Sequence, residues 1–174
     1  PDLDFTLVVT GHGTDPTGDD VTYCADPSNP PAGVFCDQQE RDSVTVDIRE
    51  IFEGLTPGYW KNHLASWPAT GFSPNQTLES VFDVPDSLGL DNATLLQALS
   101  FTGGSGTKGA AQTLLREAVA ALLNSAHPNL DYPRTTASVI NDVNAALASG
   151  NRSTMLTLAA ALDADNNLGG DINS

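Results

Sequence analysis

The sequence predicts an α+β protein, in which a small N-terminal antiparallel β part is followed by a bundle of about five short α-helices. In the first 54 residues, apolar and polar residues alternate with the period of two that is typical of half-buried strands. From residue 55 onward, apolar residues recur with the 3.6-residue period of helices. A chain of 174 residues suits one compact domain or two small ones. We therefore expect a β-rich part over residues 1–54 and a helical module over residues 55–174.

The N-terminal part has one alternating segment at each end. The first presents Leu3, Phe5, Leu7 and Val9 on one face, and the second presents Val44, Val46 and Ile48. A terminal strand of this kind can add to the sheet edge of a neighbouring subunit, and head-to-tail addition produces filaments. The alternative is an ordinary edge strand that pairs within its own chain.

Cys24 and Cys36 are the only two cysteines, and a loop rich in proline and glycine separates them. Neither belongs to a CxxC motif, and no second pair is present to complete a zinc site. We predict a local Cys24–Cys36 disulfide in preference to two free thiols. Such a bond indicates an extracellular location.

The charge of the chain is strongly negative, with 22 acidic and 7 basic residues and a net charge of −15. Nucleic acids and anionic membranes are therefore poor partners, and no apolar run is long enough for membrane insertion. Calcium is the expected cofactor, because aspartate oxygens are its usual ligands. The candidate ligands are the aspartates of two loop regions: Asp15, Asp19, Asp20, Asp26, Asp163 and Asp165. The alternatives are that these residues cap their own turns, or that the acidity serves solubility or a salty habitat.

The helical module opens with both tryptophans of the chain. If residues 60–67 are helical, Trp60, His63, Leu64 and Trp67 share one face, and Pro68 ends the helix. Further helix starts are expected at Pro74, at Asp91 or Asn92, after the glycine-rich bridge 103–109, at Thr135 or Thr136, and at Ser153. Three formal N-glycosylation sequons begin at Asn75, Asn92 and Asn151. Each also fits a helix cap, which is the interpretation we prefer.

The usual catalytic motifs do not fit this chain. The glycine-rich bridge fails as a phosphate-binding loop because Lys108 is followed by Gly109 instead of serine or threonine. His12, His63 and His127 lie far apart in the sequence and have no zinc-binding spacing. We therefore expect a protein that is not an enzyme, with no catalytic and no cofactor-binding residues apart from the calcium ligands.

An ordered series of motifs carries a family resemblance. The chain has TPGYWKNH at residues 56–63, Trp67-Pro68, AVAALLNSAHP at residues 118–128, and NNLG at residues 166–169. Over roughly residues 55–169 it resembles a helical module of secreted microbial surface proteins, to which no enzymatic activity is attached. Relatives in that group often have one cysteine before the first motif and another at the end of the module. Here those positions are Leu55 and Gly169, so the resemblance implies closure of the module without a disulfide.

The function expected from these features is that of an extracellular structural or surface protein. We predict that it self-assembles into a filament or matrix by N-terminal strand addition, with calcium bridging the acidic surfaces. Its partner is then a second copy of the same chain. Two alternatives stay open: a monomeric adhesion or ligand-binding module, and a secreted hydrolase that uses His63 with two acidic residues.

Overall fold

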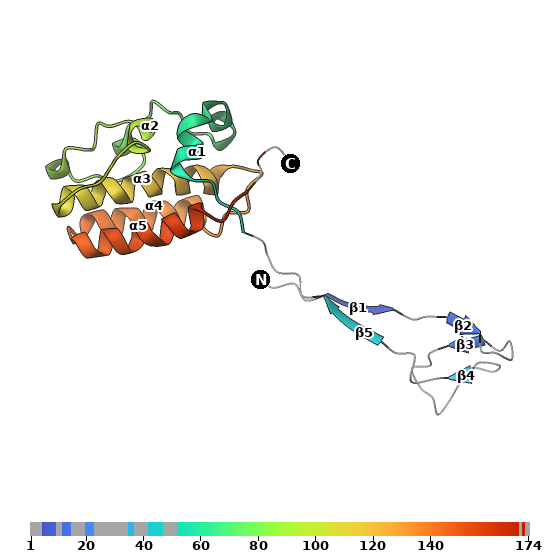
Figure 1. Cartoon of the computed structure of the whole chain (residues 1–174). Coiled ribbons are helices and arrows are strands. Elements are labelled where there is room, and N and C mark those ends of the chain that lie inside the picture. Colours follow the sequence, from blue (N-terminus) through green and yellow to red (C-terminus); the bar gives the residue numbers. More distant parts are fainter. Residues whose placement is uncertain are drawn as a thin grey trace. The chain divides into compact units, whose positions relative to one another are not determined.

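A computed structural model describes residues 52–170 and Ile172 in full, together with the backbone of five short strands between Phe5 and Val46. The chain divides into two compact units, residues 1–50 and residues 51–174. Figure 1 shows the five strands in the first unit and all of the labelled helices in the second.

The five strands form two separate ladders. β1 (Phe5–Val9) pairs antiparallel with β5 (Asp42–Val46), and this places Phe5 opposite Val46 and Leu7 opposite Val44. β2 (His12–Thr14) pairs antiparallel with β3 (Asp20–Thr22), which pairs parallel with β4 (Phe35–Cys36). The predicted strand residue Leu3 lies outside the described residues.

The predicted α+β fold class is wrong. From residue 52 onward, the described residues contain helices and turns but no strand, apart from two isolated bridges. The short strands of the first unit form ladders of only two and three strands, and no sheet packed on the helices is described. Alternation of apolar and polar residues shows that a segment can present an apolar face. A stable β part also needs enough paired strands to bury that face. The described fold is a mainly helical domain.

The described residues of the helical unit form five α-helices and three short 3₁₀ helices. The α-helices are α1 (Pro57–Asn62), α2 (Leu95–Ala98), α3 (Gly106–Ala126), α4 (Thr136–Ala148) and α5 (Arg152–Asn166). The 3₁₀ helices are η2 (Leu64–Thr70), η3 (Leu78–Ser80) and η4 (Asp86–Leu88). Among the residues described, no helix is both long and apolar enough to cross a membrane.

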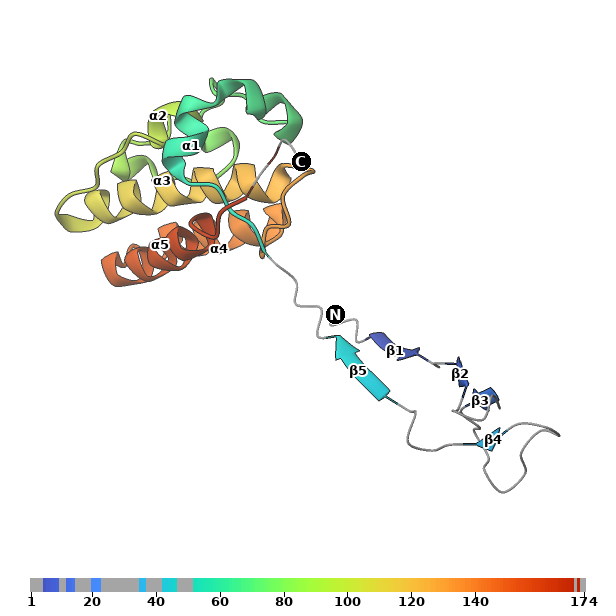
Figure 2. The same cartoon turned by 45° about the vertical axis from the view of Figure 1, so that its right-hand side comes forward.

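Helix α3 is the centre of the domain. It packs against α4 and α5 on one side, and α1, η2, α2 and η4 contact it as well. Figures 1 and 2 show the segment over residues 71–96 on the side of α3 away from α5. All residues from Glu117 to Asn124 are buried, so this part of α3 is enclosed on every side. Such a helix is stabilised by packing around its whole circumference, not by one amphipathic face.

The segment that contains Trp60 and Trp67 does not form the single helix that the sequence predicts. Thr56 caps α1 by accepting a hydrogen bond from the Tyr59 N–H, but the helix ends at Asn62. The chain then tightens into η2, which contains Pro68 instead of ending before it. Trp60 and Trp67 are buried, and the Trp67 indole donates to the Trp60 carbonyl at 3.0 Å. His63 and Leu64 are exposed, because the change of helix type turns them away from the core.

The helix caps follow the sequence in part. Thr135 caps α4, as predicted, by accepting from the Ser138 N–H at 3.2 Å. Asn151 caps α5 in place of Ser153, and Thr94 caps α2 in place of Asp91 or Asn92. In each of these two cases the cap belongs to a sequon, but only at Asn151 is the asparagine itself the capping residue.

The start of α3 depends on a close backbone contact at Gly109. A methyl group at this position would overlap the backbone of Gly104, which the glycine-rich turn places against α3. We expect Gly109→Ala to lower the unfolding free energy by about 3 kcal/mol, because neither backbone segment can move aside cheaply. Gly58→Ala in α1 is the matched control, since its methyl group would meet only Thr56 Oγ1 at 3.6 Å. That variant should be neutral or stabilised by about 0.5 kcal/mol in chemical denaturation. Equal effects of the two changes would contradict this account of Gly109.

Candidate functional site

The two ends of the helical domain meet at a short backbone pair. The Gly54 N–H donates to the Gly169 carbonyl at 2.8 Å, and the Gly169 N–H donates to the Gly54 carbonyl at 3.0 Å. The Glu53 N–H donates to the Asp131 carbonyl at 2.8 Å next to this pair. A side chain at Gly54 would overlap the backbone of Asp165. The chain therefore enters and leaves the domain side by side.

Asn124, near the end of α3, holds the entering segment from inside. Its side chain is 0% exposed, and its Oδ1 accepts from the Leu55 N–H at 3.0 Å and from the Trp60 indole at 2.8 Å. Its Nδ2 donates to the Leu55 carbonyl at 2.9 Å and to Asn166 Oδ1 at 3.0 Å. These four hydrogen bonds use the full capacity of a primary amide.

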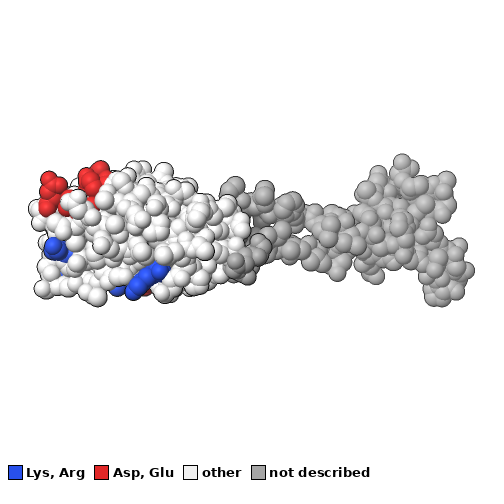
Figure 3. Space-filling model, turned by 90° about the horizontal axis from the view of Figure 1, so that it is seen from above, with Lys and Arg blue, Asp and Glu red and all other residues white. Residues whose placement is uncertain are grey.

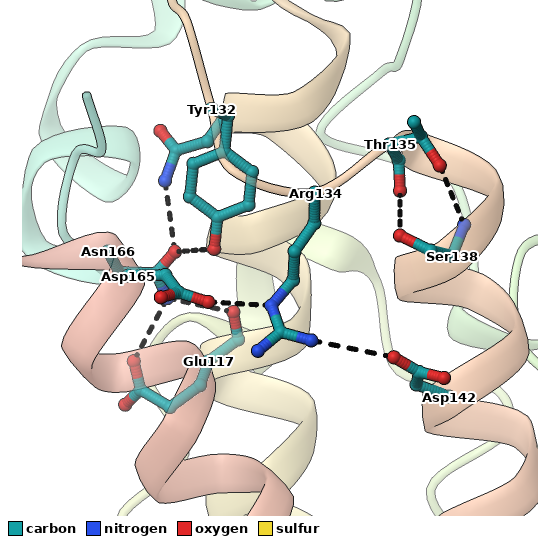
Figure 4. Close-up of polar contacts among 9 residues, drawn as sticks. Glu117, Tyr132, Arg134, Thr135, Ser138, Asp142, Asp165 and Asn166 are labelled. Carbon is teal, nitrogen blue, oxygen red and sulfur yellow. Dashed lines mark hydrogen bonds and ion pairs between the residues drawn. The ribbon is translucent and has the colours of Figure 1, made fainter. Parts of the chain in front are cut away.

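Asn166, the last residue of α5, completes a buried amide pair with Asn124. Its Oδ1 also accepts from the Tyr132 hydroxyl at 2.9 Å (Figure 4). Its Nδ2 donates to the backbone carbonyl of Glu117 at 3.1 Å and to Glu117 Oε2 at 3.3 Å. This second amide is also 0% exposed and fully satisfied. We call Asn124, Asn166, Tyr132, Trp60 and Glu117 the closure network.

Charges around the closure network keep Tyr132 as a hydrogen-bond donor. Burial raises the pKa of its hydroxyl, and the negative charges of Asp165 and Glu117 raise it further, while Arg134 lowers it. The phenol therefore stays protonated and donates to Asn166. Glu117 is itself buried, and its Oε1 accepts from Arg116 Nε at 2.8 Å.

An open hollow of about 530 Å³ lies beside the network, between the start of α4 and the end of α5. Arg134 lines it and joins the two helices, because its Nε donates to Asp165 at 2.6 Å and its Nη1 approaches Asp142 at 3.5 Å (Figure 4). The Ser138 hydroxyl also lines the hollow, but it donates to the Thr135 carbonyl and not toward a base. The hollow can bind a polar group, and the described contacts contain no activated nucleophile.

The histidine of the opening motif lies on the surface. The His63 ring stacks on Tyr59 with 4.0 Å between ring centres, and its Nδ1 lies 2.8 Å from the Tyr59 carbonyl. The described hydrogen bond of the His63 ring is to Tyr59 alone, without a carboxylate. The structure therefore does not join His63 to the two acidic residues that the hydrolase alternative requires.

The six predicted calcium ligands divide into two groups. Asp15, Asp19, Asp20 and Asp26 lie where no side chain is described. Asp163 accepts from the Asn167 amide at 3.1 Å, and Asp165 binds Arg134. Within residues 52–170, no three His, Cys, Asp or Glu side chains gather as a metal site. Calcium binding stays a prediction that concerns chiefly the N-terminal aspartates.

The other predicted sites belong to the first unit. The side chains of Cys24 and Cys36 lie outside the described part of the chain, and so does the predicted disulfide. Of the strand-exchange residues, Phe5, Leu7 and Val9 belong to β1, whose backbone pairs with β5 of the same chain. Addition of this strand to a neighbouring chain stays a prediction.

Sequence reasoning missed the closure network, although Trp60, Asn124 and Asn166 stand within the motifs that carry the family resemblance. A usable signal was the composition of α3, in which Asn124 follows the apolar run AVAALL. A polar residue in a helix that is apolar all round is buried, and a buried amide must find partners. Its partners Leu55 and Asn166 are 69 and 42 residues away in the sequence, so a local sequence pattern could not identify them.

The fold and the network together define a helical domain closed at its own ends by two buried amides. The sequence model of the protodermal factor 1 C-terminal domain matches residues 56–167. That match covers more than half of the chain and includes every residue of the closure network. The chain belongs to the protodermal factor 1 C-terminal domain family.

Comparison with curated proteins and with solved structures found no match. The resemblance to a module of secreted microbial surface proteins stays a prediction.

The closure network predicts a large effect of Asn124→Ala. The change leaves the Trp60 indole and both backbone groups of Leu55 without their buried partner, so we expect a loss of about 3 kcal/mol in unfolding free energy. Asn62→Ala is the control, because its amide makes an exposed hydrogen bond within α1 and should cost less than about 1 kcal/mol. Urea denaturation of both variants measures the difference. A loss below 1 kcal/mol for Asn124→Ala would show that the network is dispensable.

His127 directly follows the last residue of α3. Its buried ring leads us to expect that the protein loses stability in acid. The ring is buried and lies 6.0 Å from the Trp60 ring, and its Nδ1 accepts from the Asn129 N–H at 3.3 Å. Burial lowers the pKa of His127 below the ordinary value of 6.5. As the pH falls below 6.5, the unfolded chain binds a proton before the folded protein does, so folding stability falls.

The measurement is unfolding free energy against pH between 7 and 5. We expect the wild-type protein to lose stability over this range by at most about 1.4 kcal/mol per pH unit from this one group. His127→Gln removes the titrating group and should flatten the curve. An identical slope in the variant would show that another group is responsible.

Proposed function

We propose that this chain is a non-enzymatic, extracellular structural protein of a cell surface or matrix, in which the helical domain is the folded building block. The observation that carries the proposal is the closure network. The buried amides of Asn124 and Asn166 are fully used in joining the entry and the exit of the domain. Enzyme sites instead keep polar groups available for a substrate.

The adjacent ends support the role of a building block. Gly54 and Gly169 are paired directly, so the domain can be carried on a chain without separating the segments on its two sides. The closure is internal, with partners from α1, α3, α5 and the loop that carries Tyr132.

The distribution of charge supports an assembly function of the first unit. Residues 1–50 contain 11 acidic and 2 basic residues, whereas residues 51–174 contain 11 acidic and 5 basic residues. The net charges are thus −9 and −6, and the shorter unit has the larger charge. On the face of the helical domain in Figure 3, charged side chains are few and most of the surface is uncharged. Calcium would reduce the repulsion between N-terminal units of neighbouring copies.

Self-assembly by strand addition is part of this proposal. β1 lies in a two-stranded ladder, so one of its two edges has no partner among the described strands. An edge of this kind is a template for another strand. The strand that docks there comes, in our proposal, from a second copy of the chain.

A monomeric ligand-binding module is the second candidate. The hollow beside Arg134 favours this candidate. The guanidinium group of Arg134, two carboxylates and a hydroxyl group line the same open space. This mixture of donors and acceptors suits a neutral polar ligand better than an ion.

Removal of residues 1–10 tests the assembly. We expect the full chain to form polymers in millimolar calcium, visible by light scattering and electron microscopy, and to remain smaller when a chelator is present. The truncated chain lacks β1 and should sediment as a single species in both conditions. Polymers formed by the truncated chain would exclude strand addition, and a monomeric full chain in calcium would favour the ligand-binding candidate.

A further inference from the structure

The segment over residues 71–96 contains two exposed asparagines in turns. Asn75 lies in the turn that the Gln76 N–H closes by donating to the Ser73 carbonyl at 3.0 Å. Asn92 lies in the turn that the Ala93 N–H closes by donating to the Leu90 carbonyl at 3.1 Å. Both side chains are exposed, and each residue begins a sequon, Asn75-Gln76-Thr77 or Asn92-Ala93-Thr94.

The structure removes the helix-cap explanation for these two residues. The capping oxygen of α2 belongs to Thr94, and η3 has no side-chain cap. The side chain of Asn75 makes no hydrogen bond among the described residues, and that of Asn92 only donates to the neighbouring Asp91. Neither asparagine is therefore required by the fold.

The third sequon differs because its asparagine caps a helix and its other two residues lie within that helix. Asn151 Oδ1 caps α5 by accepting from the N–H groups of Ser153 and Thr154, at 2.8 and 3.3 Å. The remaining sequon residues, Arg152 and Ser153, already belong to the helix. Thr77 and Thr94 instead have extended backbones and face each other in an isolated antiparallel bridge. Since acceptor sequons belong to surface loops, the fold favours the first two over the third.

We infer that Asn75 and Asn92 are acceptor sites for N-linked glycans, and that Asn151 is a structural cap that stays unmodified. The inference rests on the proposed extracellular function, because only an exported chain meets the modifying enzyme. In the reaction, asparagine Nδ2 forms a bond to C1 of the sugar and releases a proton to solvent. The C1–O bond to the pyrophosphate of a lipid-linked glycan donor breaks, and the lipid pyrophosphate leaves.

The placement of the two sites has a structural consequence. Their segment covers α3 on the side away from α5 (Figures 1 and 2). Glycans there would extend from the loop side of the domain and leave the α4–α5 side uncovered. The polar hollow beside Arg134 lies between α4 and α5, so it would stay accessible in the modified protein.

The test is expression of the full chain with a secretion signal in a eukaryotic host, followed by intact mass measurement and peptide mapping. We expect two glycans, removable by peptide N-glycosidase with conversion of Asn75 and Asn92 to aspartate. Asn75→Gln and Asn92→Gln should each remove one glycan, and the double variant should have the unmodified mass. Asn62→Gln is the matched control, since Asn62 is exposed but begins no sequon.

Two results would overturn the inference. A secreted, folded chain with unmodified Asn75 and Asn92 would exclude both sites, and equal occupancy of Asn151 would exclude selection by the fold. Thermal denaturation of each variant establishes that it is folded. Fractionation of the native source tests export separately, so failure of the extracellular function can be distinguished from failure of the modification.

Discussion

The buried amide pair of Asn124 and Asn166 is the interaction on which the rest of the helical domain depends. Between them, the two side chains make seven distinct hydrogen bonds, and these connect α3 with α5, the Leu55 backbone, the Trp60 indole and Tyr132. A buried polar network is stabilising only when all its members are satisfied, because a partner left unpaired in a low-dielectric interior is costly. Trp67 extends the network by donating to the Trp60 carbonyl, so Asn124 of α3 fixes the opening motif through Trp60.

The amide pair closes the helical domain without a disulfide. Residues 51–174 contain no cysteine, and Asn124 binds both the N–H and the carbonyl of Leu55. A disulfide at such a position would act largely by restricting the unfolded chain. Hydrogen bonds act only in the folded state, so they are lost together with the core. Closure and core packing therefore form one cooperative unit, and a weakened core also releases the ends.

The sequence predicted the helical half far better than the β half. The 3.6-residue pattern located α3, α4 and α5, because each buries enough apolar surface to impose its own period. It missed the change from α1 to η2 after Asn62, which depends on how Trp60 and Trp67 pack on α3. The predicted β part failed because alternation is a local property, whereas a sheet requires partners from distant segments. The closure network was missed for the same reason, since Asn124 meets Leu55 across 69 residues.

The geometry of closure determines how the domain responds to a pull on its two ends. Gly54 and Gly169 pair antiparallel, so Glu53 and Gly170 leave the pair at the same end. A force that separates Glu53 from Gly170 acts first on the Glu53–Asp131 backbone bond and on the two glycine hydrogen bonds, which lie where the chain enters and leaves the domain. The bonds of Asn124 to Leu55 are loaded next, and these lie inside the core, where water cannot replace them during the first movement. The backbone pair is thus the outer connection between the two ends of the domain, and the buried amide pair is the inner one. Asn124 is therefore the residue that links the entering segment of the chain to α3 and, through Asn166, to the end of α5.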